Sequence, residues 1–144
     1  MGAGLLVRDR SGRVLLVEPT YKPNWEIPGG AVEVDESPRE CAAREVGEEI
    51  GVELTPGRLL VIDYQHPEPE RTESIMFVFD GGIVDAARSD QIELAANELR
   101  SWRLVAPEEL PTLAVPRLRR RIEHALVAVA ERQTFYLENG HPFP

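Results

Sequence analysis

The sequence predicts a single α/β domain built on a mixed β-sheet, and three observations support this fold class. The chain has 144 residues, a length typical of one domain. Hydrophobic residues make up 42% of it, enough for a sizeable core. Short apolar runs typical of strands alternate with two longer segments of helical periodicity, an order typical of α/β proteins. One domain over residues 1–144 is therefore expected.

The first part of the chain predicts two strands, a loop and a helix. Residues 5–7 and 14–17 are apolar runs separated by a polar, glycine-containing turn. Three prolines then interrupt regular structure as far as Gly29-Gly30. Ser37 is a typical N-cap and Pro38 a typical first helical residue, so a helix is predicted from Pro38 to about Ile50, ending at Gly51.

The rest of the chain predicts further strands and one long helix. Strands are expected over 59–62, 75–79 and 102–105, an irregular strand within 83–94, a helical turn at 107–110, and an edge strand or docking tail at 136–138. Pro116 opens the last helix, whose apolar stripe comprises Leu118, Ile122, Ala125, Leu126 and Val129. The four arginines at 117 and 119–121 predict a solvated helix face, with phosphate contact by one of them as the alternative.

The charge of the chain is strongly acidic and unevenly placed. The formal net charge is −9, and residues 33–53 contain eight acidic and two basic side chains, which gives that segment −6. This balance excludes broad electrostatic binding to polymeric nucleic acid or to an anionic membrane, which needs a basic face. The acidic segment is either a solvated helix or a place where cations bind.

Cys41 is the only cysteine, so an internal disulfide and a cysteine-based zinc site are excluded. Its small neighbours predict a thiol packed on a helix. The apolar run at the N-terminus is too short for a signal peptide or a membrane span. A cytoplasmic, reduced compartment is therefore expected.

Three glutamates of the predicted helix conflict with its local physics. Glu45, Glu48 and Glu49 stand at i, i+3 and i+4, so they share one face and repel one another. Glu48 and Glu49 also lie near the C-terminal end of the predicted helix, where the helix dipole disfavours negative charge. Arg44 relieves part of this repulsion by pairing with Glu48 or Glu40. A hard divalent cation such as Mg²⁺ would relieve the rest, since it prefers oxygen ligands; an acidic solvent-exposed face is the alternative.

The pattern around this helix resembles the Nudix box. The residues that match are Gly30, Glu36, Arg44, Glu45, Glu48, Glu49 and Gly51, with apolar Val46 and Val52 and the lead-in Pro28-Gly29. The resemblance to the Nudix hydrolases (MutT-like enzymes) implies an α/β/α sandwich with a mixed sheet between helices. It also implies hydrolysis of a nucleoside diphosphate linked to another group. Asp35 departs from the glycine that many members have, so a different local turn is expected.

The resemblance also implies roles for individual residues. The carboxylates of Glu45, Glu48 and Glu49 would bind Mg²⁺, or Mn²⁺, with help from the Gly30 carbonyl. A carboxylate from outside the box would complete the site, and Glu98 is the first candidate, with Glu93 second. Arg44 would hold a box glutamate in place and Glu36 would support the loop. Glu45 or Glu49 would be the base that activates the attacking water.

The substrate is less well defined by the sequence. Plausible contacts from the variable loops are Tyr21, Lys22, Trp25, Tyr64 and His66. Core packing is the alternative for Trp25 and Tyr64, and a solvent-exposed side chain is the favoured alternative for Lys22. A small nucleotide such as a nucleoside triphosphate, ADP-ribose or a nucleotide sugar is the expected partner. A non-catalytic Nudix domain that senses a nucleotide is the second hypothesis, and an acidic protein-interaction domain the third. Many family members are dimers, so a homodimer is one assembly that the resemblance allows.

Overall fold

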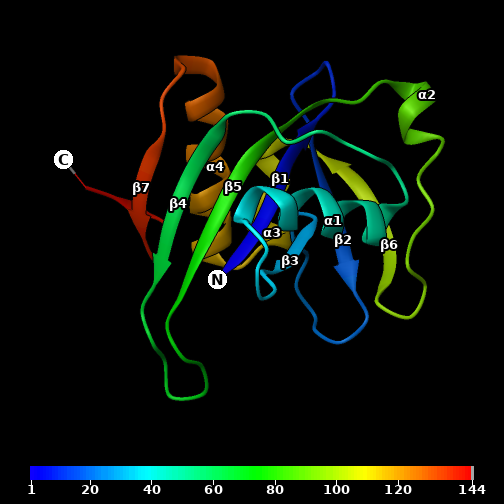
Figure 1. Ribbon diagram of the computed structural model, residues 1–144. Coiled ribbons are helices and arrows are strands. Elements are labelled where there is room, and N and C mark those ends of the chain that lie inside the picture. The colour runs from blue at the N-terminus through cyan, green and yellow to red at the C-terminus, as the bar shows by residue number, and fades with distance from the viewer. Residues whose placement is uncertain (144) are drawn as a thin grey trace.

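The structure, a computed structural model, describes residues 1–143 and shows a sheet with helices on both faces (Figure 1). The strands are β1 Gly2–Arg8, β2 Val14–Pro19, β3 Gly29–Ala31, β4 Leu59–Gln65, β5 Ser74–Ile83, β6 Leu99–Val105, β7 Phe135–Glu138 and β8 His141–Pro142. The helices are α1 Pro38–Ile50, α2 Ala86–Ser89, α3 Leu110–Leu113 and α4 Pro116–Glu131, with a short 3-10 turn, η1, at Pro107–Glu109. Within residues 1–143, none of these helices has both the length and the apolar character needed to span a membrane.

The sheet is mixed, as the sequence predicts. Its strand order is β6-β2-β1-β5-β4-β7-β8, and β3 pairs with β1 beside that path. The pairs β1–β5 and β4–β7 are parallel, whereas β2–β6, β4–β5 and β1–β3 are antiparallel. The two strands that contain segments 5–7 and 14–17 pair only at Arg8 and Val14, and β1 pairs mainly with β5 and β3. β1 is therefore the central strand, in contact with three others.

The core has two layers, one on each face of the sheet. Alternate residues of β1 point to opposite faces, so Leu5 packs with α1 residues such as Val46, and Leu6 packs with α4 residues such as Ile122. Strands buried on both faces are apolar along their whole length, which explains the continuous runs in β1 and β2. The expected α/β class is confirmed, with α1 and α4 as the two covering helices.

Helix α1 begins and ends at the predicted residues. Ser37 Oγ accepts a hydrogen bond from the Glu40 N–H at 3.1 Å, and Glu40 Oε2 accepts one from the Ser37 N–H at 3.0 Å, which completes a capping box. Gly51 ends the helix with a left-handed φ of 68°, and its N–H donates to the Gly47 carbonyl. The two caps set the bounds of α1 and therefore the positions of its glutamates along the helix.

The turn before α1 contains a residue with a positive φ. Asp35 has a φ of 62°, in the left-handed region that glycine adopts without steric cost and that aspartate tolerates. The Glu36 N–H donates to the Glu33 carbonyl at 3.2 Å and closes the turn. Asp35 thus holds a backbone conformation that a glycine would also adopt.

Strand β3 is an element that the sequence pattern does not predict. Its three residues, Gly29, Gly30 and Ala31, supply almost no side chain, and they pair with Gly2, Ala3 and Gly4 of β1. The two backbones approach so closely that a Cβ on Gly29 would lie 2.4 Å from the Ala3 carbonyl oxygen. Only glycine permits this approach, so β3 is held by backbone pairing rather than by apolar packing.

The expected irregular strand within residues 83–94 is wrong. β5 continues to Ile83, after which Asp85 caps the short helix α2 by accepting a hydrogen bond from the Arg88 N–H at 2.9 Å. A capping aspartate followed by alanines favours a helical turn over a strand. The following loop donates the N–H of Ala95 to the Glu49 carbonyl at 3.0 Å, and so satisfies one of the free carbonyls at the end of α1.

The arginines at the start of α4 are not all on a solvated face, contrary to the expectation. Arg121 is 4% exposed, and its Nε donates to Asp63 Oδ2 of β4 at 2.7 Å. Asp63 is fully buried and its other oxygen accepts the N–H of Gly140 at 3.0 Å. A buried charge needs a partner and hydrogen bonds, and this pair joins β4, α4 and the β7–β8 turn.

Replacement of Asp63 by alanine is expected to lower the free energy of unfolding by about 3–5 kcal/mol, because the buried guanidinium of Arg121 loses its carboxylate. Urea unfolding followed by circular dichroism measures the change. The double variant Asp63→Ala/Arg121→Met removes both charges and should lose considerably less. A loss below about 1 kcal/mol in the single variant, as for a surface pair, would contradict this view of the pair.

Candidate active site

The carboxylates of Glu45 and Glu49 lie against the backbone of β3. Glu49 is 9% exposed, and its Oε1 accepts a hydrogen bond from the Gly29 N–H at 2.6 Å. Glu45 is half-buried, and a Cβ on Gly30 would lie 2.3 Å from its carboxyl carbon. A glycine at position 30 therefore makes room for the Glu45 carboxylate. Glu48, one turn away, is exposed on the surface of α1.

Arg44 is the cation at the centre of these carboxylates. Its Nε and Nη2 donate to the two oxygens of Glu36 at 2.6 and 2.9 Å, a bidentate geometry. Its Nη1 lies 3.1 Å from Glu45 Oε1 and 3.2 Å from Glu48 Oε2. Pairing with Glu48 is thus observed. The expected alternative, a pair between Arg44 and Glu40, is not observed, because Glu40 caps the helix. Glu36 holds the Arg44 guanidinium most closely.

The pKa values of these carboxyl groups are shifted in opposite directions. Hydrogen bonds from Arg44 lower the pKa of Glu36 to about 2. Burial raises the pKa of Glu49 to about 8, against the opposing effect of the Gly29 N–H, and burial also raises the pKa of Glu45. Strongly perturbed carboxyl groups beside a cavity are typical of functional sites. A cation placed between Glu45 and Glu49 would favour the ionised form of both.

Glu98 and Glu93 occupy different places relative to these glutamates. Glu98 is exposed just before β6, and its negative charge contributes to the raised pKa values of both Glu45 and Glu49. Glu93 lies at the far end of α1, where its N–H donates to the Ile50 carbonyl at 2.9 Å. Of these two candidates for the additional carboxylate, Glu98 is therefore the one whose charge acts on Glu45 and Glu49.

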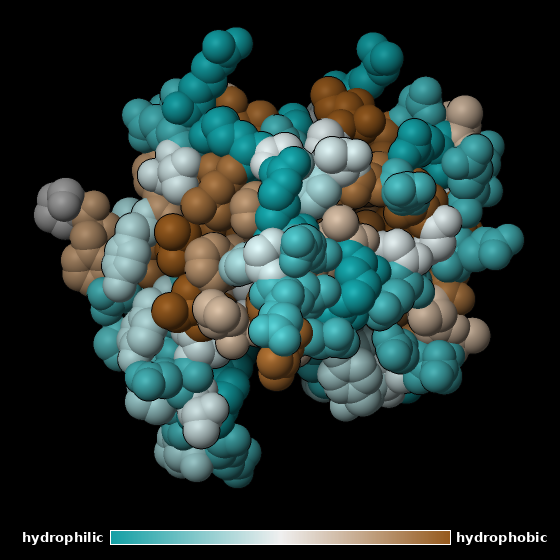
Figure 2. All heavy atoms as spheres, viewed as in Figure 1, coloured by the Kyte–Doolittle hydropathy of each residue, from teal (hydrophilic) through white to brown (hydrophobic). Residues whose placement is uncertain are grey.

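The donor set suits a hard divalent cation. Its side chains offer oxygen atoms only, from Glu45, Glu48 and Glu49, and such ligands are preferred by Mg²⁺ and Mn²⁺. Within residues 1–143, no three acidic, histidine or cysteine side chains converge closely enough to form a metal site in this arrangement. In this arrangement Glu48 faces Arg44 and Glu49 faces Gly29. Figure 2 shows hydrophilic residues gathered over α1, where these glutamates lie.

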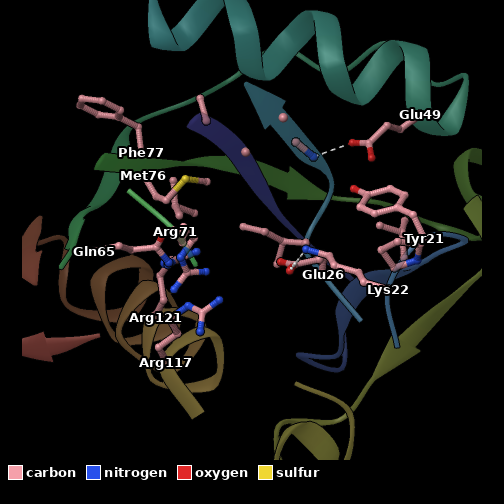
Figure 3. A pocket seen from close by; sticks show the side chains of 18 residues that line it. Tyr21, Lys22, Glu26, Glu49, Gln65, Arg71, Met76, Phe77, Arg117 and Arg121 are labelled. Atoms are coloured by element: carbon pink, nitrogen blue, oxygen red, sulfur yellow. Dashed lines mark hydrogen bonds and ion pairs between the residues drawn. The ribbon is translucent and has the colours of Figure 1, made fainter. Parts of the chain in front are cut away.

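A cavity of ≈230 Å³ lies beside the Gly29–Gly30 strand (Figure 3). It is lined by residues of β1, β2, β3, β4, β5, α1 and α4 and by the loops after β2 and β4. The lining residues are Ala3, Gly4, Val17, Pro19, Tyr21, Lys22, Glu26, Ile27, Gly29, Gly30, Glu49, Gln65, Arg71, Met76, Phe77, Val78, Arg117 and Arg121. Of the expected site residues, Gly30, Glu49, Tyr21 and Lys22 therefore face one cavity.

The other three expected substrate contacts lie elsewhere. Trp25 packs against the core on the α4 side, with the Arg103 guanidinium 5.9 Å from its ring. The Tyr64 hydroxyl donates to Glu73, in the loop just before β5. His66 Nε2 lies 2.7 Å from Glu138 Oε1. None of the three belongs to the lining of the cavity beside Gly29 and Gly30.

The sequence predicts only part of the basic lining of the cavity. It offers phosphate contact by one of the arginines at 117 and 119–121 as an alternative, but it does not predict that Arg71 and Gln65 line the same cavity. Arg71 comes from the β4–β5 loop, Arg117 and Arg121 from α4, and Gln65 from the end of β4. The spacing of Arg117 and Arg121, at i and i+4, places them on one helix face, and this is the only local signal. Their approach to Arg71 depends on how α4 packs against the sheet.

A family model, curated proteins and solved structures all match most or part of this chain. The family model described as the NUDIX domain matches residues 1–125. A putative 8-oxo-dGTP diphosphatase of Bacillus subtilis (strain 168) is 34% identical over 122 residues, which cover 84% of this chain and 76% of that protein. Human diphosphoinositol polyphosphate phosphohydrolase 3-alpha is 43% identical over 63 residues, but this match covers only 43% of this chain and 38% of that protein. The crystal structure of a MutT protein from Methanosarcina mazei Go1 is similar with a TM-score of 0.72 and 28% identity, over 92% of this chain and 94% of that one.

Replacement of Gly30 by alanine is expected to weaken Mn²⁺ binding roughly tenfold or more, a loss typical of disturbed ligand support, because the new methyl group displaces the Glu45 carboxylate. Electron paramagnetic resonance of Mn²⁺ measures the affinity. Gly47→Ala is the matched control, since a Cβ there meets no atom within 4 Å. The control should bind Mn²⁺ normally and gain about 0.5–1 kcal/mol of stability from its helical alanine. Unchanged affinity in Gly30→Ala would remove Glu45 from the proposed ligands.

Proposed function

The chain belongs to the Nudix hydrolase family, and from this premise we propose that it is a divalent-metal-dependent pyrophosphohydrolase. Its substrate would be a nucleoside diphosphate linked to another group, cleaved at the diphosphate by water that attacks phosphorus. The observation that carries the proposal is the position of Glu45 and Glu49. Both carboxylates lie against Gly29 and Gly30, and Glu49 lines the neighbouring cavity.

The residues that would hold the metal are Glu45, Glu48, Glu49 and the Gly30 carbonyl, with Glu98 as a further carboxylate. When bound, Mg²⁺ or Mn²⁺ supplies positive charge that neutralises the phosphate oxygens. Without such a charge the acidic side chains would repel a polyanion. Arg44 contributes by positioning, since its bidentate pair with Glu36 ties the loop before α1 to the helix while its Nη1 orients Glu45.

Glu49 is the favoured proton acceptor for the attacking water, and Glu45 is the alternative. Glu49 faces the cavity, whereas Glu45 is not part of its lining. Burial raises the pKa of Glu49, and a bound cation would oppose that effect and keep the Glu49 carboxylate ionised, as a proton acceptor must be. The Gly29 N–H holds Oε1 of Glu49 and leaves its Oε2 to accept a proton.

The identity of the substrate is a separate question from the reaction type. The names of the relatives include an 8-oxo-dGTP diphosphatase and a diphosphoinositol polyphosphate phosphohydrolase, which act on different compounds. The cavity residues Tyr21 and Lys22 are the expected contacts with the base or sugar, and Lys22 forms an ion pair with Glu26 at 2.6 Å. A nucleotide sensor without catalysis remains the second candidate, though sensing alone would not require all three box glutamates.

Replacement of Glu49 by glutamine is expected to lower kcat by about 10²–10⁴-fold, because the amide cannot accept the proton but can still accept the Gly29 hydrogen bond. The assay measures turnover of nucleoside triphosphates, ADP-ribose, NADH, dinucleoside polyphosphates and nucleotide sugars with Mg²⁺. Glu45→Gln should also be strongly impaired. Glu53→Gln, an exposed position beyond α1, serves as the control with the same loss of charge. Wild-type rates in both Glu45→Gln and Glu49→Gln would show that the site is assigned wrongly.

Removal of divalent metal by EDTA is expected to abolish turnover, and addition of Mg²⁺ or Mn²⁺ should restore it, because the carboxylates then meet the phosphates without a neutralising charge. Product analysis by chromatography identifies which bond is cleaved. Calorimetric nucleotide binding without turnover of any compound in the panel would favour the sensor instead.

A further inference from the structure

The cavity has two ends of opposite charge, and the proposed function uses only one of them (Figure 3). Glu49 lies at the end formed by α1 and β3. At the other end the guanidinium groups of Arg71, Arg117 and Arg121 come together from the β4–β5 loop and the first turns of α4. In the close-up these three side chains lie across the cavity from Glu49. They form what we call the arginine cluster.

The positive charge of the arginine cluster is incompletely neutralised. Arg121 pairs with buried Asp63 at 2.7 Å, and Arg71 pairs with exposed Glu68 at 3.3 Å. Arg117 forms no ion pair with any residue in the range 1–143 that the structure describes. Three guanidinium groups thus face two carboxylates, one of them on the surface. An unpaired cation that is partly buried beside two others is costly unless an anion joins it.

The hydrogen-bond donors of the arginine cluster are also incompletely used. Arg71 Nε is buried and has no hydrogen-bond partner. With its amide oriented to satisfy both neighbours, the Gln65 oxygen accepts from Arg121 Nη2 at 2.6 Å and from Arg117 Nε at 3.1 Å. One neutral oxygen therefore holds two guanidinium groups side by side. Burial, and the neighbouring charge of Arg71, lower the pKa of Arg117, as expected for a cation without a counter-ion.

We propose that the arginine cluster is an anion subsite that binds a phosphate or carboxylate group on the part of the substrate beyond the cleaved diphosphate. Guanidinium groups bind both kinds of anion through paired N–H donors. The inference rests on the proposed function, since it places the diphosphate at the Glu49 end. The proposal narrows the substrate class to nucleotide derivatives in which the part beyond the cleaved diphosphate carries a further negative charge.

The first test measures anion binding without turnover. Thermal unfolding is followed in EDTA with increasing inorganic phosphate at constant ionic strength, so that the acidic end has no metal with which to hold phosphate. Wild-type protein should be stabilised by phosphate, because an anion that binds only the folded state raises Tm. Arg117→Met and Arg71→Met should lose most of this shift. Arg119→Met, on the same helix but paired with Glu123 at 3.4 Å, should keep it.

Two results of this first test would overturn the anion subsite. One is a wild-type protein whose Tm does not respond to phosphate. The other is an equal response in Arg117→Met, Arg71→Met and the Arg119→Met control. Arg71 lies in a loop, so its variant reports on the cluster even if Arg117→Met is poorly folded.

The second test compares matched substrates that differ by one anionic group. NADPH is compared with NADH, and UDP-glucuronate with UDP-glucose, through kcat/KM with Mg²⁺. Wild-type protein should prefer the anionic member of at least one pair roughly tenfold to a hundredfold, the range expected for hydrogen bonds to a charged group. Arg117→Met should remove that preference while still turning over the member that lacks the additional anionic group.

The two tests distinguish a failure of the proposed anion subsite from a failure of the proposed hydrolase function. Equal kcat/KM values within both pairs, in a protein that hydrolyses them, would overturn the subsite and leave the proposed function standing. Phosphate stabilisation that depends on Arg117, in a protein that hydrolyses none of the four compounds or the wider panel, would support the subsite and contradict the hydrolase.

Discussion

The close approach of strands β1 and β3 is the constraint on which the candidate site depends. Gly29 can pair with the backbone of β1 only because it has no side chain, since a Cβ there would lie 2.4 Å from the Ala3 carbonyl oxygen. The pairing brings the Gly29 N–H under α1, where it meets Glu49, and leaves Gly30 facing Glu45. Because Gly29 and Gly30 have no side chains, the carboxylates of Glu49 and Glu45 can lie directly against this strand. The apolar contacts between α1 and β1 then hold the helix over them.

The charges around α1 show how the fold tolerates an acidic site. Arg44 touches Glu36, Glu45 and Glu48, so one guanidinium offsets much of the local repulsion. Glu49 lies outside this network, and its charge is opposed by burial and by Glu45. Local repulsion in a helix whose caps are otherwise favourable is the pattern expected where function, rather than stability, selects the residues. In the structure Arg44 holds Glu36 most closely, whereas Glu49 is held by the Gly29 N–H instead.

The opposite face of the sheet supplies the other half of the cavity. Asp63 and Arg121 form a buried pair that joins β4 to α4. Arg117 lies one turn earlier on the same helix and also lines the cavity. A chain with a net charge of −9 thus contains a local excess of positive charge. The net charge describes the surface as a whole and says little about one cavity.

The sequence by itself determined the α/β class, the bounds of α1 and the glutamates that α1 carries, because caps and helical spacing are local properties. Pro38, Ile50 and Gly51 lie where the sequence predicts them. Strand β3 was outside its reach, since it depends on backbone pairing with a distant strand. The Asp85 cap of helix α2 is a local signal, which the expected strand over 83–94 left unused. Only the tertiary structure decided that Arg121 is buried. Its partner Asp63 is 58 residues away, and a helical pattern does not reveal which of four neighbouring arginines will meet a carboxylate.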